Sequence, residues 1–470
     1  HILAESKTPP FEIVDNPNAS ELLRFEYRYL DMRRKPLQEK IRLRHEATMA
    51  IRNYLSGVGF YEIETPLLIR STPEGARDYV VPSRVQHGKF YALPQSPQLL
   101  KQILMISGFD KYFQLARCLR DEDLRSDRQP EHTQIDMEMS YVTPDDVFAV
   151  IEGLMPYVFK TVIGVEVPSP FPRYTFAEVM NRWGIDKPDL RFGMEIVDLS
   201  EVVAGCGFKV FTDTLGAGGL AYVLRTEAED KSPILKFIGE SVKDKLCEKA
   251  GAQKGDALFI ISDKKMKTEM ILGQLRLQLG REHNLIKQGE YRFLWVVDFP
   301  LFEFDEASGR FQAMHNIVSH PKEEDLGLID AGFTSKLPGT DLNHPWRQAR
   351  AMQYDLVVNG SEIASGGQRI NRRELQEKIL AILGIDAERA ERMFGFLLRA
   401  LEYGAPPHAG IAPGLDRLVA LMTGADSIRD VIAFPKTANA ISPMDGAPTP
   451  IEPEQLAELG LIIKGEDQSR

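Results

Sequence analysis

Charged residues in two segments of the chain have the spacing of a site for an anionic substrate. Arg120 and Glu122 lie two residues apart in FQLARCLRDE, an expected strand, so both side chains would share one face. Arg417 falls in the first turn of a helix expected after GIAPG, where a bound phosphate would offset the repulsion between a cation and the helix dipole. A surface ion pair and a surface arginine are the commoner explanations when each segment is taken alone.

A candidate metal site comes from a predicted hairpin. Asn359-Gly360 between apolar runs predicts a type I′ turn, which would place Asp355 and Glu362 on one face, about 7 Å apart. Two carboxylates suit Mg²⁺, which takes few protein ligands and completes its shell with substrate phosphates. Two solvated acids on an exposed face fit the same spacing at least as well.

The elements that must position these residues follow from hydrophobic periodicity. Apolar residues at helical spacing predict a long helix over 37–55, and FYEIETPLL predicts a strand ended by Pro66. HTQIDMEMSY alternates polar and apolar residues as a half-buried strand does, with Gln134, Asp136 and Glu138 on one face. Antiparallel strands with polar residues on one face would form an open platform.

Composition narrows the class of protein. The chain has 470 residues, 43% hydrophobic and 27% charged, which is ordinary for a soluble globular protein and excludes disorder. A net charge of −11 argues against a generic cationic nucleic-acid binder, although a local basic groove stays open. Three cysteines without CxxC spacing argue against a disulfide framework and a Cys-based zinc site. No apolar run reaches the roughly 18 residues of a membrane helix, and no P-loop or dinucleotide-binding glycine pattern occurs.

Taken in order, three segments resemble the motifs of class II aminoacyl-tRNA synthetases. They are the helix and strand ending at Pro66, the segment LRDE (119–122), and GLDR (414–417) opening a helix. The finer resemblance is to bacterial-type aspartyl-tRNA synthetases, and it is carried by TPEGARDY (72–79), QSPQLLK (95–101), RDEDLRSDRQPEHTQIDMEMS (120–140) and GAPPHAGIAPGLDR (404–417). It runs from about residue 6 to the C-terminus. It implies an α/β fold, the class II synthetase core with an antiparallel sheet flanked by helices, plus an inserted α/β domain similar to the bacterial GAD domain.

The resemblance also implies a division into four parts. They are a linker at 1–35 from a missing N-terminal anticodon-binding domain, catalytic core at 36–193, the GAD-like insertion at 194–290, and catalytic core with a C-terminal extension at 291–470. The chain starts without Met and with a Pro-containing segment, which we interpret as a fragment or a processed chain.

At one end of the implied site lie ATP and Mg²⁺. By resemblance, Arg120 would hold the α-phosphate and the substrate carboxylate, and Arg417 would contact the γ-phosphate. Glu122 would accept from the adenine amino group, with Gln129 near the nucleotide. The further residues implied at the nucleotide are Asp121, Gly414, Leu415 and Asp416, and the implied Mg²⁺ ligands are Asp355 and Glu362.

At the other end lies L-aspartate. By resemblance, Lys101 and Arg369 would clamp its side-chain carboxylate, the lysine as a point charge and the arginine as a bidentate fork. Asp136 would pair with Lys101. The remaining implied aspartate contacts are Glu74, Ser96 and Gln98 at the α-ammonium group and His315 beside the side chain. Asparagine would leave both cations without an anion, which costs several kcal/mol.

The implied activity is ATP-dependent activation of aspartate to aspartyl-adenylate and transfer to the 3′ end of tRNA(Asp), with tRNA(Asn) left open as a second acceptor. A cytoplasmic homodimer without a membrane partner is also implied. Two alternatives stay open. One is an asparagine- or lysine-specific relative, disfavoured by Glu74, Gln98, Lys101 and Arg369, and the other is a catalytically weak tRNA-associated or ATP-binding protein.

Four departures from the family pattern bear on the site. The anticodon-binding domain is not in this chain, and the insertion is short between Thr214 and Ala221. His315 is followed by NIVSHP where the family usually has HHPFT, and the preceding AMH favours His315 over His320. Ala364, Ser365 and Gly366 stand where the family usually has a glycine triplet, which would alter the shape of the pocket.

Overall fold

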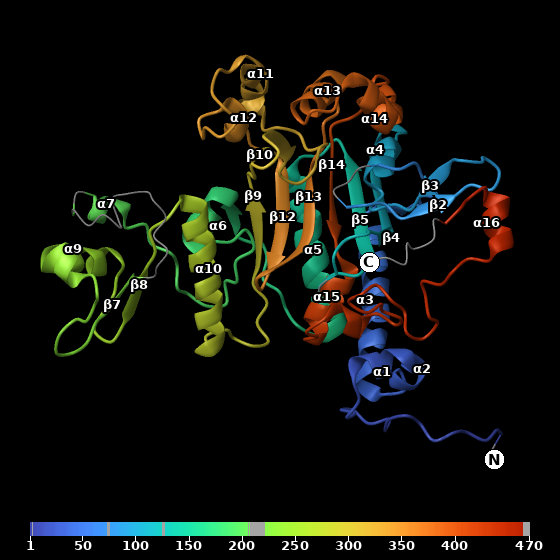
Figure 1. The fold of residues 1–470 in the computed structure, drawn as a ribbon, viewed down its shortest axis with the longest axis horizontal. Coiled ribbons are helices and arrows are strands. Elements are labelled where there is room, and N and C mark those ends of the chain that lie inside the picture. The colour runs from blue at the N-terminus through green and yellow to red at the C-terminus, as the bar shows by residue number, and fades with distance from the viewer. Residues whose placement is uncertain (2, 73–75, 125–126, 205, 207–220, 464–470) are drawn as a thin grey trace. The chain divides into compact units, whose positions relative to one another are not determined.

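Figure 1 shows the computed structural model of the chain, which describes all residues except 2, 73–75, 125–126, 205, 207–220 and 464–470. The chain divides into two units. The first consists of His1–Pro170, Pro300–Gln353 and Ile363–Arg470, and the second of Phe171–Phe299 and Tyr354–Glu362. The predicted insertion at 194–290 falls within the residues of the second unit, and the four-part division of the chain stays a prediction.

A mainly antiparallel sheet forms the centre of the first unit. Its strands there are, in spatial order, β1 (Tyr61–Glu62), β4 (Lys111–Leu119), β5 (Glu131–Ser140), β14 (His408–Pro413) and β13 (Ser361–Gln368). Only β1 and β4 pair in parallel, and the other neighbours are antiparallel. The expected α/β fold with an antiparallel sheet flanked by helices is confirmed.

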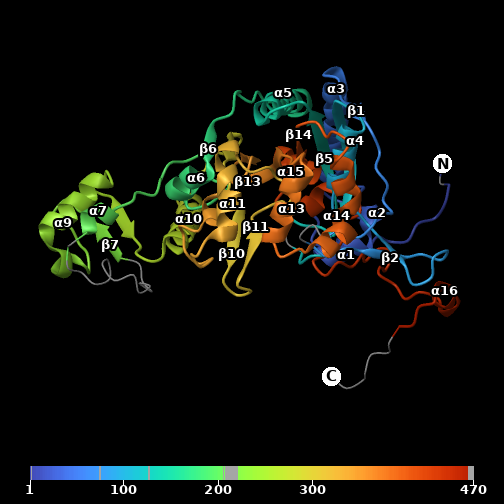
Figure 2. The same cartoon turned by 90° about the horizontal axis from the view of Figure 1, so that it is seen from above.

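Two long helices cover one face of this sheet. The helix expected over 37–55 is confirmed as α3 (Lys35–Gly57), and α5 (Pro144–Ile163) begins at a capping box and ends at the left-handed Gly164. Figure 2 shows both helices on the same side of β5 and β14. The remaining helices of the first unit are α1 (Glu21–Glu26), α2 (Arg28–Asp31), α4 (Gln98–Ile106), α11 (Leu326–Thr334), α12 (Pro345–Gln348), α13 (Arg373–Ile382), α14 (Ala387–Leu401), α15 (Leu415–Thr423), α16 (Pro453–Leu459), and the short 3-10 helices η1 (Glu323–Asp325) and η2 (Ile428–Val431).

Two small hairpins complete the first unit. They are β2 (Val80–Pro82) with β3 (Phe90–Ala92), and β10 (Phe302–Asp305) with β11 (Arg310–Ala313). Within the described residues, no helix has the length and apolar character needed to span a membrane.

The strands expected near two of the motifs are shorter than predicted. FYEIETPLL forms only the two-residue β1, because Thr65 turns to bond the Gln114 side chain through its N–H at 3.2 Å and its hydroxyl at 2.9 Å. The segment LRDE was wrongly predicted as strand beyond Leu119, where β4 ends. The reason is that the Asp121 N–H donates to the Arg77 carbonyl at 3.0 Å, so Asp121 bridges to Arg77 rather than to β5.

The half-buried character predicted for β5 is also wrong. Residues 135–140 of this strand are buried on both faces. The alternation of polar and apolar residues is present in the sequence, but charged side chains from α4 and from the end of β13 cover the polar face.

The second unit holds three further strands of sheet and a separate small hairpin. The strands are β12 (Gln353–Val358, in this unit from Tyr354 on), β9 (Phe293–Val297) and β6 (Arg173–Thr175), in this spatial order. The hairpin is β7 (Ala221–Leu224) with β8 (Ala257–Ile260). The predicted type I′ turn is confirmed, since Asn359 and Gly360 have φ values of 53° and 82°. The helices described in this unit are α6 (Phe176–Trp183), α7 (Ser200–Val203), α9 (Leu235–Lys249) and α10 (Lys265–Glu282).

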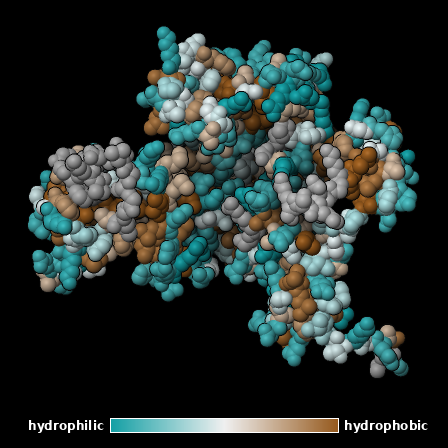
Figure 3. Space-filling view, viewed as in Figure 1, coloured by the Kyte–Doolittle hydropathy of each residue, from teal (hydrophilic) through white to brown (hydrophobic). Residues whose placement is uncertain are grey.

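Helix α10 turns its larger apolar side chains outward. Its buried stripe is Glu269, Gly273, Arg276 and Gly280, at helical spacing. Met266 and Met270 are 64% and 50% exposed, and apolar side chains are visible over this helix in Figure 3. The helix therefore packs closely through small residues rather than through its apolar ones.

Candidate active site

Four neighbouring strands of the first unit turn one row of residues to the same face of the sheet. Glu138 on β5 lies opposite Tyr112 on β4 and Gly410 on β14, and Gly410 lies opposite Gly367 on β13. Opposed residues point to the same face, so the row crosses the sheet on a single side. A Cβ atom on Gly410 would lie 1.9 Å from Glu138 Oε2, so only glycine leaves room for this carboxylate.

Lys101 reaches this face from α4 and is 1% exposed. Its Nζ lies 2.9 Å from Asp136 Oδ1 and 3.2 Å from Glu138 Oε2, and it donates to the Met137 carbonyl at 3.3 Å. The predicted pairing of Lys101 with Asp136 is therefore present in the structure. The part of both residues in substrate binding stays a prediction.

Arg369 approaches the same carboxylate from the end of β13. Its Nε donates to Glu138 Oε1 at 3.0 Å, and its backbone N–H donates to the His408 carbonyl at 2.9 Å. Glu138 thus bridges the two cations expected to clamp a substrate carboxylate, Lys101 and Arg369. Sequence reasoning placed Glu138 on the face of Asp136 but gave it no role, and the alternation along β5 was the signal that could have found it.

Burial and the two cations act in opposite directions on the paired carboxylates. Burial raises the pKa of Asp136, and Lys101 offsets only part of that rise. Burial also opposes ionisation of Glu138, but the charges of Arg369 and Lys101 outweigh it and hold the pKa of Glu138 below its usual range. Glu138 is therefore the fixed anion of the cluster, and Asp136 is the carboxylate that more readily takes a proton.

The arginines predicted at the phosphates are less buried than Lys101 and Arg369. Arg120 follows β4, and its Nε donates to the Gln95 carbonyl at 3.4 Å. Arg417 lies in the first turn of α15 as predicted; its side chain is 34% exposed and contacts Asp127 Oδ2 at 3.3 Å. Both guanidinium groups have long contacts that an anionic ligand could replace.

His132 reports the electrostatic potential around these arginines. Its pKa is lowered to about 3, first by burial and then by the positive charges of Arg120, Arg417 and Arg117. Three cations that act on one imidazole create a region where phosphate groups would be stabilised.

Two residues predicted at the nucleotide are bonded to protein groups. Lys436 N–H donates to Gln129 Oε1 at 2.8 Å, and Gln129 Nε2 donates back to the Lys436 carbonyl at 3.0 Å. Asp416 accepts from Arg44 at 2.5 Å and from the Thr133 N–H at 2.8 Å. These contacts position the backbone around the arginines, and a direct nucleotide contact of either residue stays a prediction.

Three more residues predicted at the nucleotide, Glu122, Gly414 and Leu415, lie close in sequence to Arg120 or Arg417. Glu122 accepts from Arg128 at 3.0 Å. Gly414 is the N-cap residue of α15, and its N–H donates to the Ile363 carbonyl at 2.8 Å. The first residue of this helix, Leu415, is 2% exposed. Leu415 thus belongs to the core, and its backbone rather than its side chain borders the turn.

Comparison with known proteins decides the family. The profile described as "tRNA synthetases class II (D, K and N)" matches residues 20–438. The chain belongs to this family of class II tRNA synthetases. The Aspartate–tRNA(Asp/Asn) ligase of Thermoanaerobacter pseudethanolicus is 49% identical over 494 residues, which cover 98% of this chain and 81% of that protein. The Aspartate–tRNA ligase of Lysinibacillus sphaericus is 47% identical over 496 residues, with 98% and 82% covered.

A solved structure supports the synthetase fold. The asparaginyl-tRNA synthetase from Pyrococcus horikoshii complexed with asparaginyl-adenylate matches with a TM-score of 0.52 and 19% sequence identity, covering 89% of this chain and 73% of that one. At this identity the likeness concerns the fold alone.

The predicted metal ligands of this synthetase lie in the second unit. Asp355 on β12 is 2% exposed, and Glu362 is half-buried with Lys187 Nζ 4.0 Å from its carboxylate. Among the residues that the structure describes, no three His, Cys, Asp or Glu side chains group as metal ligands. Two carboxylates would suit Mg²⁺, which completes its shell with phosphates, and the part of Asp355 and Glu362 in holding it stays a prediction.

The residues predicted around the rest of the amino acid have different surroundings in this synthetase. Gln98 is 8% exposed, and its Nε2 has no hydrogen-bond partner among the described residues. The side chain of His315 is exposed, whereas His320 is 5% exposed with Nδ1 2.6 Å from the Pro321 carbonyl. Glu74 lies outside the described residues.

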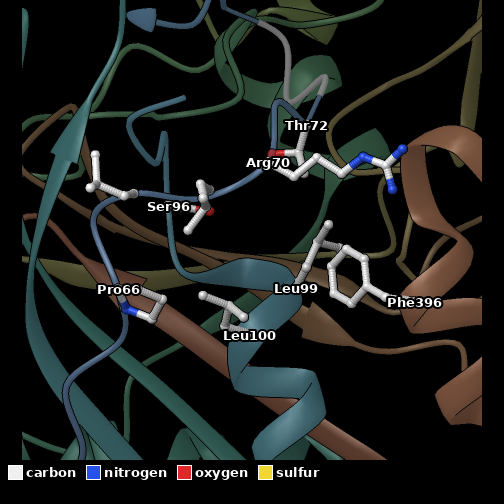
Figure 4. A pocket seen from close by; sticks show the side chains of 9 residues that line it. Pro66, Arg70, Thr72, Ser96, Leu99, Leu100 and Phe396 are labelled. Atoms are coloured by element: carbon white, nitrogen blue, oxygen red, sulfur yellow. The ribbon is translucent and has the colours of Figure 1, made fainter. Parts of the chain in front are cut away.

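Ser96 borders an apolar cavity of about 220 Å³ in the first unit (Figure 4). The lining includes Leu68, Leu99 and Phe396, and Arg70 is the one charged side chain among its described residues. An α-ammonium group has no anionic partner in this lining, so binding of the substrate there has no support. The predicted contact of Ser96 with the substrate stays a prediction.

Proposed function

We propose that the chain is an aspartate–tRNA ligase, which activates L-aspartate with ATP and transfers it to the 3′ end of tRNA(Asp). The observation that carries this proposal is the pair of buried cations, Lys101 and Arg369, joined through Glu138 on one face of the sheet. The curated relatives at 49% and 47% identity bear the names of aspartate–tRNA ligases.

The buried charge cluster explains the choice of aspartate over asparagine. A substrate carboxylate brings a negative charge to Lys101 and Arg369, and protonation of Asp136 keeps the cluster near neutral. Asparagine brings no charge, so Asp136 has to stay ionised to balance the two cations, and burial opposes that ionisation. The Nε2 of Gln98 has no partner among the described residues, which supports a polar ligand in this part of the molecule because buried donors are nearly always bonded.

The chemistry proposed is in-line attack by the α-carboxylate of aspartate on the α-phosphorus of ATP. The new bond joins the carboxylate oxygen to the α-phosphorus, and the bond to the leaving pyrophosphate breaks. The carboxylate is already ionised, so no general base is required. Arg120 and Arg417 stabilise the charge on the phosphates, and the depressed pKa of His132 supports a cationic field there.

Asp355 and Glu362 are the residues that would hold Mg²⁺. When bound, the ion would neutralise charge on the phosphates of ATP. Lys187 lies 4.0 Å from Glu362 and has to give up this contact when a cation binds.

Three further proposals concern partners and organisation. Several relatives, among them that of Thermoanaerobacter pseudethanolicus, have names that include Asp/Asn, which supports tRNA(Asn) as a second acceptor. The resemblance of α3 and β1 to motif 1 supports a homodimer, and charging of tRNA implies a cytoplasmic location. Residues 194–290 are proposed as an inserted domain.

Amino-acid-dependent exchange of pyrophosphate into ATP, measured with Mg²⁺ and each of the twenty amino acids, tests this function. Exchange with aspartate alone, lost in Arg369→Ala and kept in the surface control Arg373→Ala, is expected. No exchange with any amino acid from a folded protein that binds ATP would contradict the enzyme and favour the catalytically weak alternative. Charging of purified tRNA(Asp) and tRNA(Asn) then decides the acceptor.

A further inference from the structure

A chain of buried hydrogen bonds lies beside the charge cluster and has no part in the function described so far. Ser319 Oγ donates to Gln353 Oε1 at 3.1 Å, and Gln353 Nε2 donates to Ser365 Oγ at 2.7 Å. Ser319 and Gln353 are 2% and 4% exposed. We refer to Ser319, Gln353 and Ser365 as the relay.

The relay lies on the face of the sheet that carries the charge cluster. Ser365 and Gly367 alternate along β13 and so share a face, and Gly367 lies opposite Gly410, over which Glu138 is placed. A Cβ atom on Gly367 would lie 3.2 Å from Gln353 Oε1 and 3.4 Å from Ser319 Oγ. The relay therefore fills the space above Gly367 next to Glu138.

Backbone contacts connect the relay to Arg369. Ser319 and Arg369 form an isolated antiparallel bridge. The Ile370 N–H donates to the Val318 carbonyl at 2.9 Å, and the His320 N–H donates to the Gln368 carbonyl at 2.8 Å. Segment 318–320 thus bonds the backbone on both sides of Arg369. The relay connects this segment to the sheet through the hydrogen bonds from Ser319 to Gln353 and from Gln353 to Ser365.

We propose that the relay is a positioning device for the amino-acid substrate. It holds segment 318–320 against Arg369 and thereby fixes the direction from which the guanidinium group meets a carboxylate. This inference rests on the proposed function and extends it, because it assigns the affinity for aspartate partly to residues that do not touch the substrate. Ser365, one of the three relay residues, stands where the resembled family usually has glycine.

The first test needs no activity. Hydrogen exchange of the Ile370 and His320 amides is compared in the wild type, Ser319→Ala and Gln353→Leu. Each substitution leaves buried relay atoms unsatisfied, so protection of both amides is expected to fall about tenfold, while the amides of β5 stay unchanged. Unchanged protection at both amides in the two folded variants would overturn the inference.

The second test separates positioning from general damage. In pyrophosphate exchange, Ser319→Ala and Gln353→Leu are expected to raise the KM for aspartate about tenfold, which corresponds to about 1.4 kcal/mol, with kcat and the KM for ATP within about twofold. Ser365→Ala is expected to act in the same direction and Ser365→Thr, which keeps the hydroxyl, to restore the value. Ser83→Ala is the matched control, because Ser83 is a buried serine of the first unit that accepts from Gln86 N–H at 3.1 Å.

The outcomes of the two tests are distinct from failure of the proposed function. Equal rises in the KM for aspartate and for ATP, or an aspartate KM within twofold of wild type, would overturn the inference. Absence of aspartate-dependent exchange in the wild type would overturn the proposed function and the substrate half of this inference, and hydrogen exchange would still decide whether the relay positions Arg369.

Discussion

At the amino-acid end of the candidate site, Lys101 and Arg369 are 1% and 3% exposed and share one carboxylate. At the phosphate end, Arg417 is 34% exposed and contacts its carboxylate partner only at 3.3 Å. The first end is a buried set of opposite charges. The second is a more exposed set, in which Arg417 and Arg117 have carboxylate partners and still, after burial, help to lower the pKa of His132.

This difference matches what each end is proposed to recognise. The side-chain carboxylate of aspartate and the amide of asparagine differ by one charge. Burial makes that charge decisive, because a buried unpaired ion is costly. A triphosphate carries several charges and arrives with counterions, so an exposed cationic region attracts it without a fixed geometry. Stability should therefore depend on the first end and activity on both.

Arg369→Ala gives the largest expected effect on both activity and stability. It leaves Glu138 without one of its two cations in a buried site, and breaking such a pair costs about 3–5 kcal/mol. The free energy of unfolding in urea should fall by about that amount, and aspartate-dependent exchange should fall at least 10²-fold, a factor of ten for each 1.4 kcal/mol or so.

Arg373→Ala is the matched control, because its ion pairs with Glu377 and Glu402 are exposed and worth at most about 1 kcal/mol. An Arg369→Ala protein as stable as this control would show that the amino-acid end is not the buried set of opposite charges described above.

Arg417→Ala should reduce activity and leave stability nearly unchanged. The loss of one cation that stabilises charge in the transition state is expected to lower kcat/KM for ATP about 10²-fold. Because its contact with Asp127 is exposed, the free energy of unfolding should change by less than about 1 kcal/mol. Asp127→Ala, which removes only the partner, should keep kcat/KM for ATP, and a loss equal to that of Arg417→Ala would assign the effect to the ion pair instead.

The sequence predicted more of the elements than of their contacts. Local patterns sufficed for α3, for the turn at Asn359-Gly360 and for the common face of Asp136 and Glu138, because each depends on a few neighbouring residues. The bond between Glu138 and Arg369 joins residues 231 positions apart, and no local pattern encodes it. The end of β4 was wrongly predicted for the same reason, because it depends on the bond between Asp121 and Arg77, which are distant in the sequence.

Asp136→Asn and Glu138→Gln should change the pH dependence of stability in opposite directions. The folded-state pKa of Asp136 is raised, so its contribution is present below the unfolded pKa of about 3.9 and is lost as pH rises through the folded value. The folded-state pKa of Glu138 is lowered, so its contribution is present above the unfolded pKa of about 4.3 and is lost as pH falls.

Urea unfolding between about pH 3.5 and 7 measures both slopes. Relative to wild type, Asp136→Asn should become more stable as pH rises, and Glu138→Gln should become less stable. Slopes of the same sign would mean that the two carboxylates share one proton rather than hold separate roles.

The smallest expected effect is on the titration of His132, and it tests the phosphate end of the candidate site directly. Burial is the first cause of its low pKa, and the charges of Arg120, Arg417 and Arg117 add to it. Inorganic tripolyphosphate bound at these arginines should raise the pKa of His132 from about 3, because it brings negative charge to the same region. Arg417→Ala should raise the pKa without ligand and reduce the further rise on binding. The imidazole resonances in NMR, assigned with His132→Gln, measure both changes. A His132 pKa that stays the same when tripolyphosphate is added would mean that the phosphates bind elsewhere.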